Sequence, residues 1–202
     1  MVVEQRRPRD RVGRSAPYPV VATACLVLAV AAGWSTILLV VLGHVVPGWA
    51  VSAFLLALSP ALARALAVRH RATVDRAAPW WAPLPRFVRV LLTVAAAVGS
   101  ALGALDDLGA DYHVLRPTGP HGCTVVVRET SFLVAGSGEA YAVGPTGFAW
   151  RSSASWTTDD GYRPIATGTY DLNWTRDDGT LTVHGTPTDP VFTGGPHTLT
   201  CR

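Results

Sequence analysis

The chain has 202 residues, of which 49% are hydrophobic and 15% are charged, and its formal net charge is +3 at pH 7. Residues 1–105 have eleven Arg and three acidic residues, a net charge of +8, whereas residues 106–202 have six Arg and eleven acidic residues, a net charge of −5. Because the net positive charge lies in the more apolar half, where Arg retains the cytoplasmic loops of membrane proteins, the basic balance does not indicate nucleic acid as a partner.

The N-terminal half begins with a basic tail and continues with a long apolar stretch. Residues 1–19 contain five Arg and no apolar periodicity, so we expect a disordered cytoplasmic tail. Residues 15–63 then run for forty-nine positions without a charged side chain, which is enough for two crossings of a bilayer core of about 30 Å. We predict transmembrane helices over residues 20–46 and 50–68, with a turn between them.

A third apolar stretch, Phe87–Leu105, ends at Asp106 and has the length of a membrane-spanning helix. Residues 69–86 form the connecting loop, and six Arg within or beside this loop predict that it is cytoplasmic. The sequence therefore predicts a three-helix transmembrane domain over residues 20–105 in the cell membrane. Its N-terminus lies in the cytoplasm, and residues 106–202 form an extracytoplasmic domain.

Small residues recur at every fourth position of the third stretch, at Ala95, Gly99 and Gly103. This spacing lets the backbones of two membrane helices approach closely. The face predicts packing either against the first two helices of the same chain or against a second copy in a homodimer.

The hydrophobic period changes to two after residue 106. Tyr170, Leu172 and Trp174 alternate with polar residues, and residues 180–184 repeat the pattern after a hairpin signal at residues 178–179. Further strands are expected over residues 123–127, 131–135, 139–143, 148–152 and 197–201, with breaks at residues 128–129, 136–138 and 144–147. The predicted fold class is membrane α plus all-β: three transmembrane helices followed by a small antiparallel β sandwich or barrel of about seven strands.

Two cysteines, Cys123 and Cys201, begin the first of these strands and end the last. In an oxidising compartment outside the cell their expected state is one disulfide. A loop of this length is stabilised by about 4 to 5 kcal/mol in the chain-entropy account, which is a large share of the stability of a small domain. The alternative is a pair of free thiols with a metal or redox role, but the sequence has no CxxC motif.

Several aromatic residues of the outer domain could stack on sugar rings or contact a protein partner, because each combines a flat apolar face with a polar tip. The alternative is that they form the core of a small β domain. The candidates for ligand-facing aromatics are Trp150, Trp156, Tyr162 and Trp174.

Catalytic signatures are absent from the sequence. The Ser137 segment lacks the glycine spacing of a nucleophile elbow, and no phosphate loop, haem motif or metal-ligand spacing occurs, so no catalytic residue, metal or cofactor is expected. An enzyme would need carboxylates that meet only in the folded chain, in a deep pocket. The carboxylates considered for this role are Glu129, Glu139, Asp159, Asp160 and Asp171.

Two segments of the outer domain, WTTDDGYRP at residues 156–164 and GTYDLNW at residues 168–174, resemble small integral membrane proteins of high-GC bacteria. The resemblance covers mainly the outer domain. It implies the architecture of a membrane anchor with an outer domain, and it implies no activity.

These observations predict a non-enzymatic protein of the bacterial envelope, in which a membrane anchor in the lipid bilayer presents a β domain to a partner protein or cell-wall polymer. Two alternatives remain at this point: an envelope enzyme of the carboxylate hydrolase type, and an accessory subunit of a transport or secretion complex.

Overall fold

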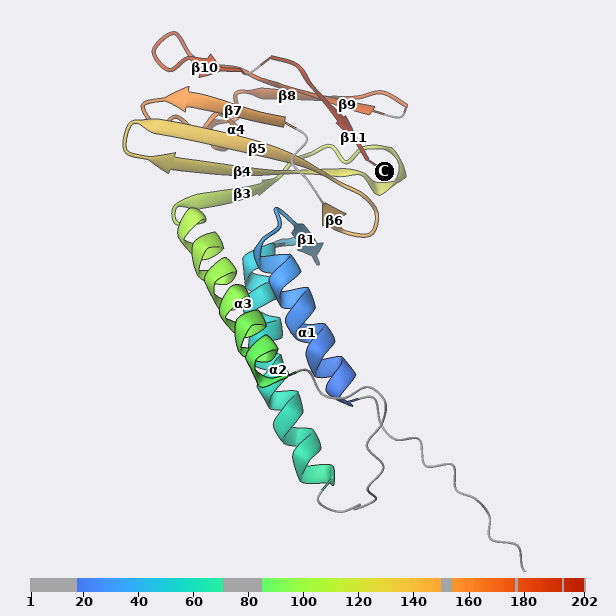
Figure 1. Cartoon of the computed structure of the whole chain (residues 1–202). Helices are drawn as coiled ribbons and strands as arrows, with labels where there is room; N and C mark the ends of the chain where they lie inside the picture. Colours follow the sequence, from blue (N-terminus) through green and yellow to red (C-terminus); the bar gives the residue numbers. More distant parts are fainter. Residues whose placement is uncertain (1–17, 71–84, 150–153, 177, 194, 202) are drawn as a thin grey trace, which may run out of the picture.

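The computed structural model describes residues 18–70, 85–149, 154–176, 178–193 and 195–201. The fold combines helices with three antiparallel sheets, and the helices lie at one end of the molecule while the sheets lie at the other (Figure 1). The predicted tail over residues 1–19 falls almost entirely outside the described residues, as does most of the predicted cytoplasmic loop.

Three long helices form the first unit: α1 (Tyr18–Gly33), α2 (Gly48–His70) and α3 (Arg86–Asp106). The prediction of one helix over residues 20–46 is wrong, because α1 ends at Gly33 and a β-hairpin follows it. The hairpin consists of β1 (Leu38–Val41) and β2 (His44–Pro47), rich in branched side chains that favour strands. Leu42 and Gly43 make its turn with φ of 52° and 81°, as a two-residue hairpin connection requires.

Among the described residues, α3 is the one helix that is long and apolar enough to cross a membrane by length and composition. The apolar segments of α1 and α2, Val21–Gly33 and Gly48–Leu62, are shorter. Three transmembrane helices are therefore not supported by the length and hydropathy of the helices.

The helical unit buries small residues and exposes large apolar ones. Ala29 and Ala96 are fully buried between the helices, and the hydroxyl of Ser100 donates a hydrogen bond to that of Ser52 at 2.8 Å. By contrast, the side chains of Phe54 and Phe87 are 65% and 67% exposed. The exposed set on α3 also includes Val90, Leu91, Val94, Val98, Leu102 and Leu105. This distribution is the reverse of that in a helical protein with a hydrophobic core in water.

The small-residue face of α3 packs against two tryptophans of the same chain. The indole nitrogen of Trp34 donates a hydrogen bond to the carbonyl of Ala95 at 2.9 Å. A Cβ at Gly99 would lie 2.8 Å from this nitrogen, and a Cβ at Gly103 would lie 2.6 Å from the Cβ of Trp49. Since both tryptophans occupy this face, a homodimer through α3 would use the opposite, exposed side of the helix.

Replacing Gly103 with leucine is expected to destabilise the helical unit by about 1 to 3 kcal/mol, because the new side chain must displace Trp49. Thermal unfolding of the full-length protein in detergent measures the effect. Ala101→Leu is the matched control, since it adds a larger side chain on the exposed side of α3. Equal unfolding temperatures for the two variants would contradict this packing.

In the described part of residues 107–201, the second unit contains nine strands and two short helical turns. The strands are β3 (Ala110–Val114), β4 (Thr124–Phe132), β5 (Ala135–Val143), β6 (Phe148–Ala149), β7 (Ala154–Asp159), β8 (Tyr170–Trp174), β9 (Asp178–Val183), β10 (Val191–Phe192) and β11 (His197–Thr200). A single 3₁₀ turn covers Pro120–Gly122, and α4 covers Pro164–Thr167. Figure 1 shows α3 leading directly into β3, which lies beside the helices, whereas β10 lies at the far edge.

The nine strands, with β1 and β2, make one five-stranded sheet and two three-stranded sheets. The five-stranded sheet has the order β10-β7-β5-β4-β3, and the others have the orders β11-β9-β8 and β2-β1-β6. The prediction of a barrel is wrong because the sheets are open. A shared core of buried residues joins the five-stranded sheet to the sheet of β8, β9 and β11: Val125, Val127, Ala140, Trp156, Leu181, Val183 and Leu199.

Two predicted breaks in the strands are also wrong. Residues 128–129 lie within β4, and the glycines at 136 and 138 lie within β5, so β4 and β5 form one long hairpin with its turn at residues 133–134. Gly138 pairs with Trp156 of β7, and a Cβ on this glycine would lie 2.1 Å from the indole ring. The glycine therefore makes room for the largest buried side chain instead of ending the strand.

The β1–β2 hairpin ties the two units together. Leu38 and Leu39 of β1 pair with Ala149 and Phe148 of β6 in an antiparallel ladder. Leu38 is also buried in a second cluster with side chains of β4, β5 and β6, which are Val126, Tyr141, Val143 and Ala149.

Candidate functional site

The strongest candidate site is a cavity of about 160 Å³ between the helical unit and the five-stranded sheet. We call it the junction cavity. Its lining residues come from the end of α1 and the segment after it, from the β1–β2 hairpin, and from α2, the end of α3, β3, β4 and β5. They include Trp49, Asp107, Tyr112, Arg128, Glu139 and Tyr141.

A hydrogen-bonded cluster centred on Asp107 organises this cavity. Asp107 directly follows α3 as its C-terminal cap, and its carboxylate accepts hydrogen bonds from the indole of Trp49 at 2.8 Å and from the hydroxyl of Tyr112 at 2.9 Å. Nε of Arg128 donates to the same carboxylate at 2.8 Å, and Nη2 donates to the carboxylate of Asp106 at 2.8 Å. The side chains of Asp107 and Arg128 are only 10% and 14% exposed, so this ion pair is largely removed from water.

Glu139 is held more loosely than the two aspartates. Its Oε2 lies 3.9 Å from Nη1 of Arg128 and accepts a hydrogen bond from the hydroxyl of Tyr141 at 2.7 Å, and its side chain is 39% exposed. Burial lowers the pKa of the Arg128 guanidinium, but its hydrogen bond to Asp107 and the charge of Asp106 raise that pKa, and the net shift is upward. Arg128 therefore remains charged throughout the accessible pH range.

Two tyrosines of the junction cavity hold their protons more tightly than an exposed phenol. Burial raises the pKa of Tyr112, and the hydrogen bond to Asp107 raises it further. Burial likewise raises the pKa of Tyr141, together with its hydrogen bond to Glu139. Since the folded-state pKa lies above the unfolded value of about 10, both protons stabilise the fold fully below pH 10. This stabilisation is lost as the pH rises above 10 through the folded-state pKa.

We expect an alkaline titration of the protein to show a late tyrosinate phase that coincides with unfolding. The phase arises because Tyr112 and Tyr141 ionise only when their burial is lost. Near-ultraviolet absorbance, followed together with circular dichroism, measures it. The double variant Tyr112→Phe/Tyr141→Phe should lack the phase, whereas a late phase of unchanged amplitude in this variant would contradict the assignment.

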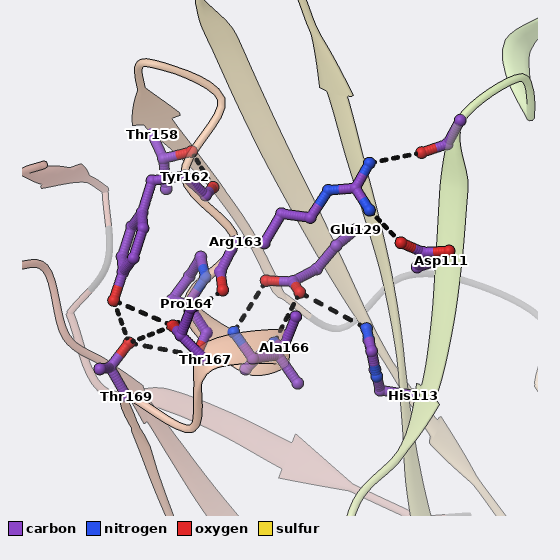
Figure 2. Close-up of polar contacts among 12 residues, drawn as sticks. Asp111, His113, Glu129, Thr158, Tyr162, Arg163, Pro164, Ala166, Thr167 and Thr169 are labelled. Atoms are coloured by element: carbon purple, nitrogen blue, oxygen red, sulfur yellow. Dashed lines mark hydrogen bonds and ion pairs between the residues drawn. The ribbon is translucent and has the colours of Figure 1, made fainter.

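A separate polar cluster surrounds the buried carboxylate of Glu129, shown in Figure 2. Glu129 on β4 is 1% exposed, and its two oxygens accept hydrogen bonds from the backbone N–H groups of Ile165 and Ala166 at 2.9 and 3.0 Å. Nε2 of His113 lies 3.6 Å from Oε2, beyond hydrogen-bond distance. The carboxylate therefore fastens the first turn of α4 to the sheet, which is a structural role.

Neighbouring contacts complete this attachment of α4. Arg163 forms an ion pair with Asp111 and donates a hydrogen bond to the carbonyl of Gly109 at 2.9 Å (Figure 2). Thr158 donates to the carbonyl of Tyr162 at 2.6 Å. Glu129 thus lies in a network that positions a short turn.

A second cavity of about 230 Å³ lies beside the disulfide between Cys123 and Cys201, whose Cα atoms are 5.9 Å apart. We call it the disulfide cavity. The predicted disulfide is confirmed. The lining side chains combine an indole, two prolines, an imidazole, a carboxylate and a hydroxyl, and they belong to Trp174, Pro120, Pro145, His121, Asp178 and Thr200.

Trp174 is held firmly at this cavity. Its indole nitrogen donates a hydrogen bond to the carbonyl of Pro117 at 2.9 Å. Gly179 is the cross-strand partner of Trp174. A Cβ on Gly179 would lie 2.7 Å from the indole ring, and a Cβ on Gly119 would lie 2.6 Å from it, so the backbone packs directly on the ring at both positions. The hydroxyl of Thr200 donates to Asp178 at 2.9 Å on the same wall.

Two of the other predicted aromatic residues, Trp156 and Tyr162, do not line the junction cavity or the disulfide cavity. Trp156 is 2% exposed and belongs to the core. Tyr162 is half-buried, and its hydroxyl shares a hydrogen bond of 2.6 Å with Thr169. Trp150 lies outside the described residues. Of the three candidates that the structure describes, Trp174 is the one that lines one of these two cavities.

The carboxylates considered for catalysis are not brought together in the two cavities. Glu139 lines the junction cavity and Glu129 caps α4, whereas Asp159, Asp160 and Asp171 are exposed elsewhere. Within the part of the chain that the structure describes, no three His, Cys, Asp or Glu side chains are grouped to hold a metal ion.

Sequence reasoning missed the cluster around Arg128. Residues 128–129 were expected to interrupt the strands, although a single Arg after the apolar run Val125–Val127 is a signal for a buried ion pair. The partners of this Arg come from helix and strand ends that are distant in the sequence. No protein-family model, curated protein or solved structure matches this chain.

Proposed function

We propose that this protein is a membrane-anchored component of the bacterial envelope whose outer β unit binds a cell-wall polymer or partner protein and catalyses no reaction. The proposal of a membrane anchor is supported by the burial pattern of the helical unit, in which small residues are buried and large apolar side chains are exposed. Only 17% of the apolar window of α3 is buried, and its exposed side chains are large and aliphatic. A core helix of a water-soluble protein would bury this surface, whereas a helix in lipid exposes it.

All three helices belong to the proposed anchor. Gly33 at the end of α1 and Trp49 at the start of α2 both contact α3, so α1 and α2 lie alongside it. α3 has 21 residues, about 31 Å of helix, which matches the bilayer core. Packing against α3 would hold the shorter apolar segments of α1 and α2 within the membrane, with the β1–β2 hairpin at its outer boundary.

The charge distribution supports the orientation of the proposed anchor. Of the eleven Arg of residues 1–105, six lie within or beside the loop between α2 and α3 and five lie in the N-terminal tail, as on the cytoplasmic side of membrane proteins. The opposite end of α3 terminates at Asp106 and Asp107, beside the β unit. The disulfide of the β unit is consistent with an oxidising compartment on that side.

The disulfide cavity is the proposed ligand site of the outer unit. Its volume and its mixture of an indole, prolines, an imidazole and a carboxylate suit a neutral ligand with several hydroxyl groups, such as a sugar residue of a cell-wall polymer. His121 is exposed at the rim, whereas Trp174 is fixed by its hydrogen bond to Pro117. These two residues would provide the polar and apolar parts of the contact.

Binding of purified cell-wall fragments to the oxidised full-length protein in nanodiscs tests this proposal. We expect saturable binding that His121→Ala weakens and that Phe192→Ala leaves unchanged, because Phe192 is exposed on β10, away from the cavity. Absence of binding, together with turnover of an envelope substrate, would overturn it. Recovery of the protein in the soluble fraction without detergent would overturn the anchor itself.

A second candidate function, that of an accessory subunit, is favoured by the tip of the β4–β5 hairpin. The consecutive side chains of Phe132, Leu133 and Val134 are 78%, 82% and 68% exposed. Three adjacent apolar side chains on a loop are typical of a contact with another protein. Co-purification of larger membrane proteins with the native chain, lost when Leu133 is replaced by Ser, would favour this function over polymer binding.

A further inference from the structure

The junction cavity lies at a particular depth along α3. The last residue of α1, Gly33, contacts Gly99, and α3 continues for about 10 Å beyond that point to Asp106. The segment from Trp34 to Trp49 lies beside this last part of α3. It is not helical except at Gly48 and Trp49, and some of its residues line the cavity. If α3 spans the bilayer, as the proposed function requires, the cavity lies at the level of the outer head groups. The inference below rests on that anchor.

Three aromatic residues line the cavity: Trp49, Tyr112 and Tyr141. The polar tips of these rings are already engaged: Trp49 and Tyr112 donate to Asp107, and Tyr141 donates to Glu139. The tips are therefore fixed on carboxylates, and the rings remain as a rigid lining. Aromatic walls next to a carboxylate are the arrangement by which proteins recognise alkylammonium groups, through cation–π attraction and charge pairing.

The charge of the cavity also favours a cation. Three carboxylates line it, those of Asp106, Asp107 and Glu139, against the single guanidinium of Arg128. Arg128 lies 2.8 Å from each aspartate but 3.9 Å from Glu139, so its charge is shared mainly with the aspartates. Glu139 therefore makes no short ion pair with Arg128, and it lies at a site with an excess of negative charge.

We propose that the junction cavity binds the terminal ammonium group of an aminophospholipid head group, with Glu139 as its counterion and Trp49, Tyr112 and Tyr141 as its walls. A volume of about 160 Å³ is the space of roughly five water molecules, which fits an ethylammonium group but not an acyl chain. The lipid phosphate would lie outside the cavity, in the head-group layer. Such a lipid would fill the space between the anchor and the β unit.

The test uses the full-length protein in nanodiscs that contain phosphatidylethanolamine or phosphatidylglycerol. We expect bound phosphatidylethanolamine to be retained in native mass spectrometry and to raise the unfolding temperature, while phosphatidylglycerol does neither. Glu139→Gln, which keeps an acceptor for Tyr141, should weaken phosphatidylethanolamine binding about tenfold or more, as loss of a charged hydrogen-bond partner does. Asp160→Asn is the matched control, because it removes one exposed carboxylate far from the cavity.

Soluble ethanolamine and phosphoethanolamine form further arms of the experiment. Displacement of the lipid by either amine, in the wild type but weakly in Glu139→Gln, would support recognition of the ammonium group. Equal retention of both lipids, or equal binding by wild type and Glu139→Gln, would overturn the inference. So would binding of the soluble amines without retention of the lipid. Failure of the proposed anchor is seen separately, as a protein that does not enter nanodiscs.

Discussion

Replacing both cysteines of the disulfide, as Cys123→Ser/Cys201→Ser, is expected to lower the free energy of unfolding of the β unit by about 4 to 5 kcal/mol. The two residues are 78 positions apart, and the chain-entropy account assigns this loss to a loop of that length. Since small domains have a net stability of about 5 to 15 kcal/mol, the variant should be close to unfolding at physiological temperature. Chemical unfolding followed by tryptophan fluorescence measures the change.

Cys25→Ser is the control for this variant. Cys25 is a free cysteine in α1, so its replacement should leave the unfolding of the β unit unchanged. Reductant should destabilise the wild type and Cys25→Ser alike and should have no effect on the double serine variant. A double variant as stable as the oxidised wild type would contradict the structural role of the disulfide.

Arg128→Met is expected to cost about 3 kcal/mol or more of folding free energy. The substitution leaves the carboxylate of Asp107, which is 10% exposed, without its cationic partner, and removing one member of a buried pair costs more than the pair contributes. Asp106 adds little to this effect because its side chain is 77% exposed. Thermal and chemical unfolding of the full-length protein in detergent give the magnitude.

Two further variants separate this effect from a general loss of positive charge. Arg163→Met breaks the more exposed pair with Asp111 and should cost less than about 1 kcal/mol. Asp107→Asn, added to Arg128→Met, removes the unpaired buried charge and should recover part of the stability. Equal costs for the two arginine variants, or no recovery in the double variant, would show that Asp107 is not buried as an ion.

The sequence predicted those parts of the fold whose signal is local or unique. α3 begins and ends within one residue of the predicted stretch, because an uninterrupted apolar run next to paired aspartates has one interpretation. Cys123 and Cys201 are the two cysteines outside the apolar stretches, so each had one possible partner in a disulfide. The alternation at Tyr170, Leu172 and Trp174 likewise predicted β8 correctly.

The wrong predictions share a different physical cause. An apolar segment such as residues 34–47 is compatible with a helix or a strand, and its pairing with β6, more than a hundred residues away, decides between them. In the sequence, Gly138 looks like the end of a strand, yet the ring of Trp156 requires a glycine at that point within β5. In both cases the partner that determines the structure is distant in the chain.

The junction cavity could not be predicted for the same reason. Its lining residues come from positions between 33 and 141 and meet only after β3 turns back from α3 and β1 reaches β6. Glu139 was considered only as one half of a catalytic pair with another acid. Its neighbours in the fold are instead an arginine and a tyrosine.

The ladder between β1 and β6 has a mechanical consequence. Besides the hydrogen-bonded cluster around Asp107, the β unit is attached to the helices covalently, through the passage from α3 to β3, and secondly through the strand pairs of Leu38 and Leu39. A load on the β unit is therefore shared by α1, α2 and α3, and the two units cannot swivel about a single tether. A fragment beginning at residue 106 would lose this second attachment and uncover Val126 and Val143, so it should aggregate where the intact chain does not.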